Sequence, residues 1–194
     1  MTGSMTNSAT TVEGGGTLSG GGTFGSVTVQ SLGSLNPDAV SSSRTLMTMA
    51  SLTLNSGSTT TLDVEDINQA AGTGYDKIVI NGGALAYNGT LNITSTQTLA
   101  QLFGGVAQSV VLFSGMTTPT GDLTSVMYAG LSWTETATSS GIFTYTDGVN
   151  TYSFTDATGT LAASVVPEPG TCAMVGLGLS ALAVTIIRRR RSND

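Results

Sequence analysis

The side chains in this sequence that could do chemistry are mainly carboxylates. Asp63, Glu65 and Asp66 stand together in the segment DVEDIN. Alternate residues of a strand share one face, so Asp63 and Glu65 should lie on the same face, with Asp66 beside them. Paired carboxylates carry out glycoside hydrolysis, and several carboxylate oxygens can hold calcium. A solvated strand face is the simpler interpretation, because nothing basic stands near these residues in the sequence and the segment fits neither an EF-hand loop nor a GGxGxD repeat.

Residues that other chemistries need are missing. The chain contains no histidine, which excludes Ser-His-Asp and Cys-His arrangements and histidine metal ligands. It has no Gly-x-Ser-x-Gly elbow and no phosphate-binding loop of the GxxxxGK[ST] type. Cys172 is the one cysteine, so no intrachain disulfide can form. We therefore predict a protein that is not an enzyme and needs no cofactor.

The segment FTYTDGVNTYSF predicts a β-hairpin that turns at Asp147. With a four-residue loop, Tyr145 faces Tyr152 and Phe143 faces Phe154, which places all four rings on one face. Such a face can cap the apolar end of a β-structure, or it can bind sugar rings. Tyr145 and Tyr152 are therefore the candidate glycan-binding residues.

Composition describes the body that must position these side chains. The chain has 194 residues, a net charge of −6 and only 9% charged residues, with 26 glycines. An acidic surface excludes nucleic-acid binding, which requires Lys and Arg. A polar but weakly charged composition rich in Thr, Ser and Gly is typical of exported β-structure.

Short β-type runs bounded by Gly, Asn, Ser or Pro follow one another along the body. In the run that begins at Thr59, alternation predicts Thr60, Leu62 and Val64 on one face. The spacing of the runs permits a β-sandwich or stacked solenoid rungs, and the text GGGTLSGGGTFGSVTV favours rungs. The predicted strands are Thr17-Leu18, Val27–Val29, Leu46–Leu54, Thr59–Val64, Lys77–Ile80, Thr90–Ile93 and Ser109–Phe113.

The C-terminal stretch has the features of a membrane anchor. Residues 171–187 are uncharged and predict one transmembrane helix near the lower limit of length. Basic residues beside a span stay in the cytoplasm, so the body, residues 1–165, should lie outside it. The residues that form this stop are Arg188, Arg189, Arg190 and Arg191.

Pro167, Glu168 and Pro169, the short apolar helix and the arginine cluster together resemble a PEP-CTERM sorting signal over residues 166–191. The resemblance implies that these three residues are recognised by an exosortase, a membrane-embedded enzyme of Gram-negative bacteria that often make exopolysaccharide. It also implies an N-terminal signal peptide. The opening MTGSMTNSATTVEGGG lacks one, so we expect a misassigned start or a longer reading frame.

The motifs GGGTFGSVTV, ASLTLNSGSTTTLDVE, GYDKIVING and GTLNI resemble the C-terminal ends of autotransporter-type passenger domains. This resemblance implies an all-β fold, a right-handed β-solenoid at the cell surface, of which the chain is the C-terminal part. These repeats are scaffold and bring no catalytic residue.

Two functions remain. The favoured hypothesis is a structural or adhesive protein of the envelope or extracellular matrix, anchored in the inner membrane and then moved to the surface after processing. The alternative is a polysaccharide-binding module or a remnant of a β-helical polysaccharide-acting enzyme.

Overall fold

The computed structural model of the chain describes residues 3–6, 8–38, 44–137 and 140–165. Within these ranges the regular structure is almost wholly β, which confirms the predicted class, and the one helix is α1 (Leu99–Phe103). None of the described residues forms a helix of the length and hydrophobicity needed to cross a membrane. The predicted helix over residues 171–187 lies outside the described ranges.

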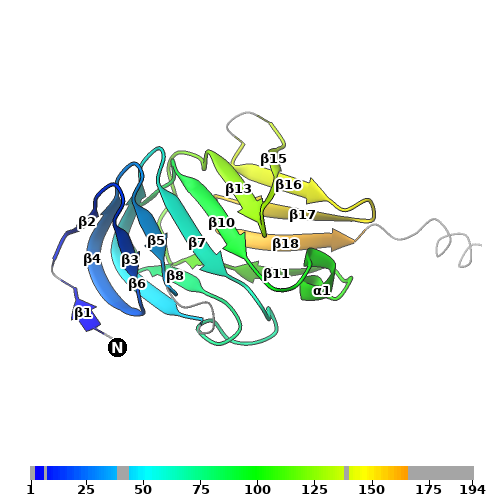
Figure 1. Cartoon of the computed structure of the whole chain (residues 1–194), viewed down its shortest axis with the longest axis horizontal. Helices are drawn as coiled ribbons and strands as arrows, with labels where there is room; N and C mark the ends of the chain where they lie inside the picture. Colours follow the sequence, from blue (N-terminus) through cyan, green and yellow to red (C-terminus); the bar gives the residue numbers. More distant parts are fainter. Residues whose placement is uncertain (1–2, 7, 39–43, 138–139, 166–194) are drawn as a thin grey trace, which may run out of the picture.

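Two parallel sheets build most of the body, and the chain passes back and forth between them (Figure 1). Neighbouring strands in both sheets are parallel, apart from β13 and β14. Among the described residues, the first sheet contains β1 (Gly3–Met5), β2 (Thr10–Val12), β4 (Gly22–Val29), β6 (Leu46–Leu54), β8 (Lys77–Ile80), β9 (Leu85–Ala86) and β12 (Phe113–Ser114). In the same ranges, the second sheet contains β3 (Thr17–Ser19), β5 (Ser34–Asn36), β7 (Thr59–Asp63), β10 (Thr90–Thr94), β13 (Ser125–Tyr128) and β14 (Leu131–Ser132).

Apolar side chains on neighbouring parallel strands lie in register in the interior. Val27 lies opposite Leu52, and Leu52 lies opposite Leu85, and each is at most 1% exposed. Burial of each such side chain stabilises the fold by about 1.5–3 kcal/mol relative to exposure. At half-buried positions hydroxyls stack in the same way, with Thr90 Oγ1 and Ser125 Oγ 3.1 Å apart. This pattern explains why the strands alternate aliphatic residues with Thr or Ser.

Close approach of neighbouring turns depends on glycine at particular positions. A Cβ added to Gly83, between β8 and β9, would overlap the backbone carbonyl of Ala50, and one added to Gly25 in β4 would overlap that of Ser8. Glycine therefore allows backbone contacts between turns that any side chain would block.

The predicted strand positions agree with the structure, with one exception. Thr60, Leu62 and Val64 are all 0% exposed, as the alternation predicted. The run Ser109–Phe113, predicted as one strand, is divided between β11 (Gln108–Val111) and β12. β11 pairs antiparallel with β18, whereas β12 pairs parallel with β8. A continuous apolar run carries no signal of a change of partner, which is why the sequence did not reveal this division.

A third, antiparallel sheet lies at the C-terminal end of the parallel sheets (Figure 1). The predicted hairpin belongs to it and has the predicted register, because Tyr145 lies opposite Tyr152 and Phe143 opposite Phe154. The last pair before the loop joins Thr146 to Thr151, which leaves residues 147–150 between the paired residues. The order of the strands in this sheet is β11, β18 (Thr160–Val165), β17 (Asn150–Thr155), β16 (Ile142–Thr146) and β15 (Thr134–Glu135).

Candidate functional site

The first two carboxylates of the acidic segment accept hydrogen bonds from Thr94, the last residue of β10, and from Thr96 just after it. Asp63 accepts a hydrogen bond from the Thr94 hydroxyl. Glu65 accepts two from Thr96, one from the backbone N–H at 2.6 Å and one from the hydroxyl at 2.5 Å. Arg44 Nη2 also lies 3.3 Å from Glu65 Oε1. Arg44 lies far from this segment in the sequence, and the fold brings it to Glu65. The sequence therefore showed no sign of a basic residue here.

The third carboxylate, Asp66, is engaged within its own loop. Its oxygens accept hydrogen bonds from the Asn68 backbone N–H at 2.9 Å and from Gln69 Nε2 at 3.0 Å. The first of these bonds lowers the pKa of Asp66. Across the ranges that the structure describes, no group of three or more His, Cys, Asp or Glu side chains is arranged to hold a metal ion. The three acids of the segment therefore have separate partners.

Asp76, in the motif GYDKIVING, is a buried acid that sequence reasoning did not single out. It is 0% exposed, and its two oxygens accept hydrogen bonds from the backbone N–H groups of Thr45 at 2.6 Å and Asp63 at 2.9 Å. Burial raises the pKa of Asp76 to about 6, and the negative charges of Asp63 and Asp38 act in the same direction. Asp76 therefore ties the segment before β6 to the end of β7. The only signal in the sequence was an acid placed directly before a buried strand.

The aromatic hairpin packs against the end of the parallel sheets. Phe143, Tyr152 and Phe154 are at most 2% exposed. The ring of Phe154 lies 6.3 Å from that of Phe113 in β12, and the ring of Tyr152 lies 5.8 Å from that of Phe103 in α1. This packing favours the capping interpretation of the hairpin over a free aromatic platform.

Of the two candidate glycan-binding residues, only Tyr145 reaches the surface. Its ring is half-buried and nearly parallel to those of Trp133 and Tyr152, at 6.4 and 6.5 Å. Tyr152 is 1% exposed, and its hydroxyl donates to Asp147 Oδ2 at 2.9 Å. Burial and this bond to an acceptor raise the pKa of Tyr152 to about 12. Backbone hydrogen bonds, led by that from Asn150, lower the pKa of Asp147 to about 2.

Tyr145 borders a groove of about 430 Å³, here called the aromatic groove, together with residues 95–100, Tyr128, Leu131 and Asp147. The Tyr128 hydroxyl donates to the backbone carbonyl of Gln97 at 2.8 Å, and Leu131 is 46% exposed. The lining combines apolar side chains with the hydroxyl-bearing residues Ser95, Thr96 and Thr98, a composition that suits a sugar ring. Among the described residues that line the groove, Asp147 is the one acid.

Asp156, just after β17, is a second buried acid that the sequence did not reveal. It is 3% exposed, and Oδ2 accepts a hydrogen bond from the Leu123 N–H at 2.8 Å. Burial raises the pKa of Asp156 to about 7, with further contributions from the charges of Asp122 and Glu135. The residue joins the loop before β13 to the antiparallel sheet.

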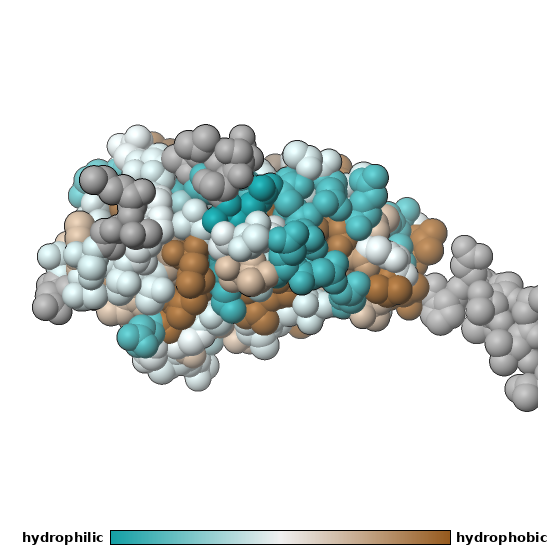
Figure 2. Space-filling view, turned by 90° about the horizontal axis from the view of Figure 1, so that it is seen from below, coloured by the Kyte–Doolittle hydropathy of each residue, from teal (hydrophilic) through white to brown (hydrophobic). Residues whose placement is uncertain are grey.

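The body ends in a strand that is bonded on both sides. β18 lies between β11 and β17, and Val165 lies opposite Asn150. Val106 and Val149, near the same end of these strands, are each 51% exposed. Figure 2 shows one face of the molecule, where hydrophobic patches are separated by hydrophilic surface.

The predicted sorting residues Pro167, Glu168 and Pro169, and the arginines after residue 187, lie outside the described ranges.

Comparison with protein families bears on this segment. Residues 165–191 match the model described as the PEP-CTERM protein-sorting motif. The C-terminal segment is a PEP-CTERM sorting motif. The prediction is confirmed, and the match begins at the last residue of β18, one residue earlier than predicted. The PEP-CTERM motif implies processing by an exosortase, a membrane enzyme, with membrane anchoring followed by export to the surface.

Neither the search of curated proteins nor the search of solved structures found a match. The resemblance to autotransporter-type repeats therefore stays a prediction.

Proposed function

We propose that this protein is a structural or adhesive component of the envelope or extracellular matrix of a Gram-negative bacterium. In this proposal its body is a right-handed β-solenoid that acts as a scaffold and has no catalytic activity of its own. The observation that carries the proposal is the PEP-CTERM motif at residues 165–191, because it implies delivery to the outside by an exosortase.

The arrangement of strands supports a scaffold. Successive turns each add parallel strands to the two sheets, and side chains such as Val27, Leu52 and Leu85 stack in register. In repeat architectures each unit contacts mainly its neighbours, which yields an elongated body of simple construction. The antiparallel sheet covers one end of this stack with Phe143, Tyr152 and Phe154. These features favour a solenoid with a capped end.

The hydrogen bonding of the acidic segment supports the absence of catalysis. Asp63, Glu65 and Asp66 each accept bonds from neighbouring protein groups, and Glu65 also pairs with Arg44. A general acid and base for glycoside hydrolysis would instead face one another across a substrate site.

The anchor works through the contrast between its apolar and basic parts. In this proposal the uncharged residues 171–187 enter the membrane, and each following arginine would cost about 2.5–3.5 kcal/mol at the centre of a span, so the cluster stops transfer of the chain. The Pro167-Glu168-Pro169 segment is then available to the exosortase. Because β18 ends at Val165, cleavage beyond that residue removes no strand of the described body.

Mass spectrometry of the mature protein from a host that carries an exosortase tests this proposal. We expect a product that lacks the arginine cluster. Glu168→Ala should leave the helix inserted but the tail uncut, whereas replacing Arg188–Arg191 by serine should impair retention. A mature C-terminus that still ends in RRRRSND would contradict the sorting mechanism and leave the segment as an anchor only.

A polysaccharide-binding role is the second candidate, and the aromatic groove favours it. Calorimetry with matrix polysaccharides should then show saturable binding that is weakened by Tyr145→Ala or Leu131→Ala. Leu32→Ala is the matched control, since Leu32 is an exposed leucine that does not line the groove. The absence of saturable binding at high protein concentration would support the scaffold function alone.

A further inference from the structure

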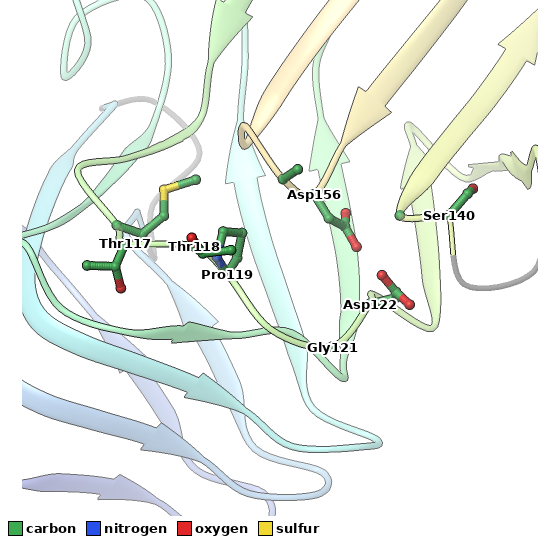
Figure 3. A pocket seen from close by; sticks show the side chains of 10 residues that line it. Thr117, Thr118, Pro119, Gly121, Asp122, Ser140 and Asp156 are labelled. Carbon is green, nitrogen blue, oxygen red and sulfur yellow. The ribbon is translucent and has the colours of Figure 1, made fainter.

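A second pocket lies where the loop between β12 and β13 meets the turn after β17 (Figure 3). Its volume is about 320 Å³, and Asp122, Gly141 and Asp156 are among the residues that line it. We call it the acidic pocket. It is separate from the aromatic groove, with which it shares no lining residue.

Asp156 brings an unpartnered oxygen to this pocket. Asp156 is only 3% exposed, and its Oδ2 accepts a hydrogen bond from the Leu123 N–H. Oδ1 is also buried and has no hydrogen-bond partner among the described residues. Figure 3 shows the Asp156 carboxylate directed toward that of Asp122. A buried carboxylate oxygen without a partner costs folding free energy, so it calls for a ligand.

The two carboxylates approach each other at Gly141. A Cβ added there would lie 3.1 Å from Asp122 Oδ1 and 3.2 Å from Asp156 Cβ. Both acids therefore lie next to Gly141, which has no side chain to separate them. Glu135 lies nearby and accepts the N–H groups of Ser140 at 2.8 Å and Gly141 at 3.2 Å. Negative charge is therefore concentrated on one side of the pocket.

No protein cation balances this charge within the described ranges. The salt bridge found there joins Arg44 to Glu65, in the acidic segment. The hydroxyl of Tyr87, which is 2% exposed and interacts electrostatically with Asp156, is another buried group without a partner among the described residues. Uncompensated like charges next to orphaned polar atoms are the arrangement that a bound cation would stabilise.

We propose that Asp122 and Asp156 bind a calcium ion in the acidic pocket. The charged donors in the lining are carboxylate oxygens, which suit hard cations, and neither histidine nor cysteine is among the lining residues. Calcium accepts six to eight oxygen ligands in flexible geometry, so the space in the pocket can hold the waters that complete its shell. A site with only two carboxylate ligands suits the weak calcium affinity of extracellular modules, with Kd of about 10⁻⁴–10⁻³ M.

Thermal unfolding of the full chain in detergent micelles tests this site. With CaCl₂ at about ten times Kd, the Tm should rise by roughly 3–6 °C relative to the protein in EGTA, because the ion binds only the folded state. The rise should be absent in Asp122→Asn and Asp156→Asn. Glu65→Gln, in the other acidic segment, is the matched control and should keep it.

A direct measurement keeps the result clear even where Asp156→Asn unfolds. Tb³⁺ occupies calcium sites and is excited through a nearby tyrosine, a role for Tyr87, which interacts electrostatically with Asp156. Tb³⁺ luminescence displaced by calcium should appear in the wild type and be lost in Asp122→Asn, whose side chain is only half-buried. Equal calcium responses in wild type and Asp122→Asn, or a response lost in Glu65→Gln instead, would overturn the proposal. A larger Tm rise with magnesium than with calcium would overturn the choice of ion.

Discussion

Asp76 and Asp156 are buried acids whose pKa values lie above the usual value of aspartate, at about 6 and about 7. Each accepts backbone N–H groups from segments that are far apart in the sequence, namely Thr45 and Asp63 for Asp76 and Leu123 for Asp156. At the scale of the residue, these acids hold loops together and lose solvation when they ionise. Ionisation of either one therefore opposes folding.

The substitution Asp76→Asn tests this effect of charge. The folded pKa is raised above the unfolded value of 3.8, so the stabilising effect of protonation is present below about pH 4 and is lost as the pH rises through about 6. Urea unfolding should show the wild type losing stability relative to Asp76→Asn between these values. Asp66→Asn is the control and should behave in the opposite sense, because the pKa of Asp66 is lowered. If the wild type instead gained stability relative to Asp76→Asn as the pH rises, the raised pKa of Asp76 would be contradicted.

The β16–β17 hairpin shows how one element closes the end of a sheet stack. Its inner face carries Phe143, Tyr152 and Phe154. The rings of Tyr152 and Phe154 pack against α1 and β12, where a further pair of parallel strands would otherwise lie. An uncovered end would expose apolar side chains to water. The hairpin therefore contributes mainly to stability.

Removal of the central ring of this cover should be costly. Phe154 is 0% exposed, so Phe154→Ala should lower the free energy of unfolding by about 3–5 kcal/mol through lost burial and a residual cavity. Phe24→Ala, in the partly buried part of β4, should cost clearly less. Denaturant titration of both variants measures the difference. Equal costs would mean that Phe154 does not have the packing role described here.

At the scale of the whole molecule, the described body and the sorting motif meet at Val165. Among the described residues, β18 is the last strand and ends at Val165, and it is held by β11 and β17. An exosortase that cleaves after this position would therefore release a body with all its strand pairings intact.

Two truncations test this independence. A chain that ends at Glu168 should unfold with a free energy within about 0.5 kcal/mol of the full chain, since it keeps every described contact. A chain that ends at Gly159 loses β18, which pairs with two neighbours, and should fail to fold its antiparallel sheet. Circular dichroism and denaturant titration distinguish these outcomes. A marked loss of stability in the longer truncation would show that the tail supports the body.

The sequence alone determined the features that depend on local order. Alternation placed Thr60, Leu62 and Val64 inside because strand side chains repeat every two residues, and the hairpin register followed from its loop length. The sorting motif was readable because it consists of neighbouring residues in one short segment.

The tertiary structure decided which distant residues meet. It brought Arg44 to Glu65, divided the run after Gln108 between two sheets, and turned Asp122 and Asp156 into one pocket. These outcomes depend on which segments, distant in the sequence, pack beside one another. Such packing is set by the summed burial of many side chains, and no single segment carries that information.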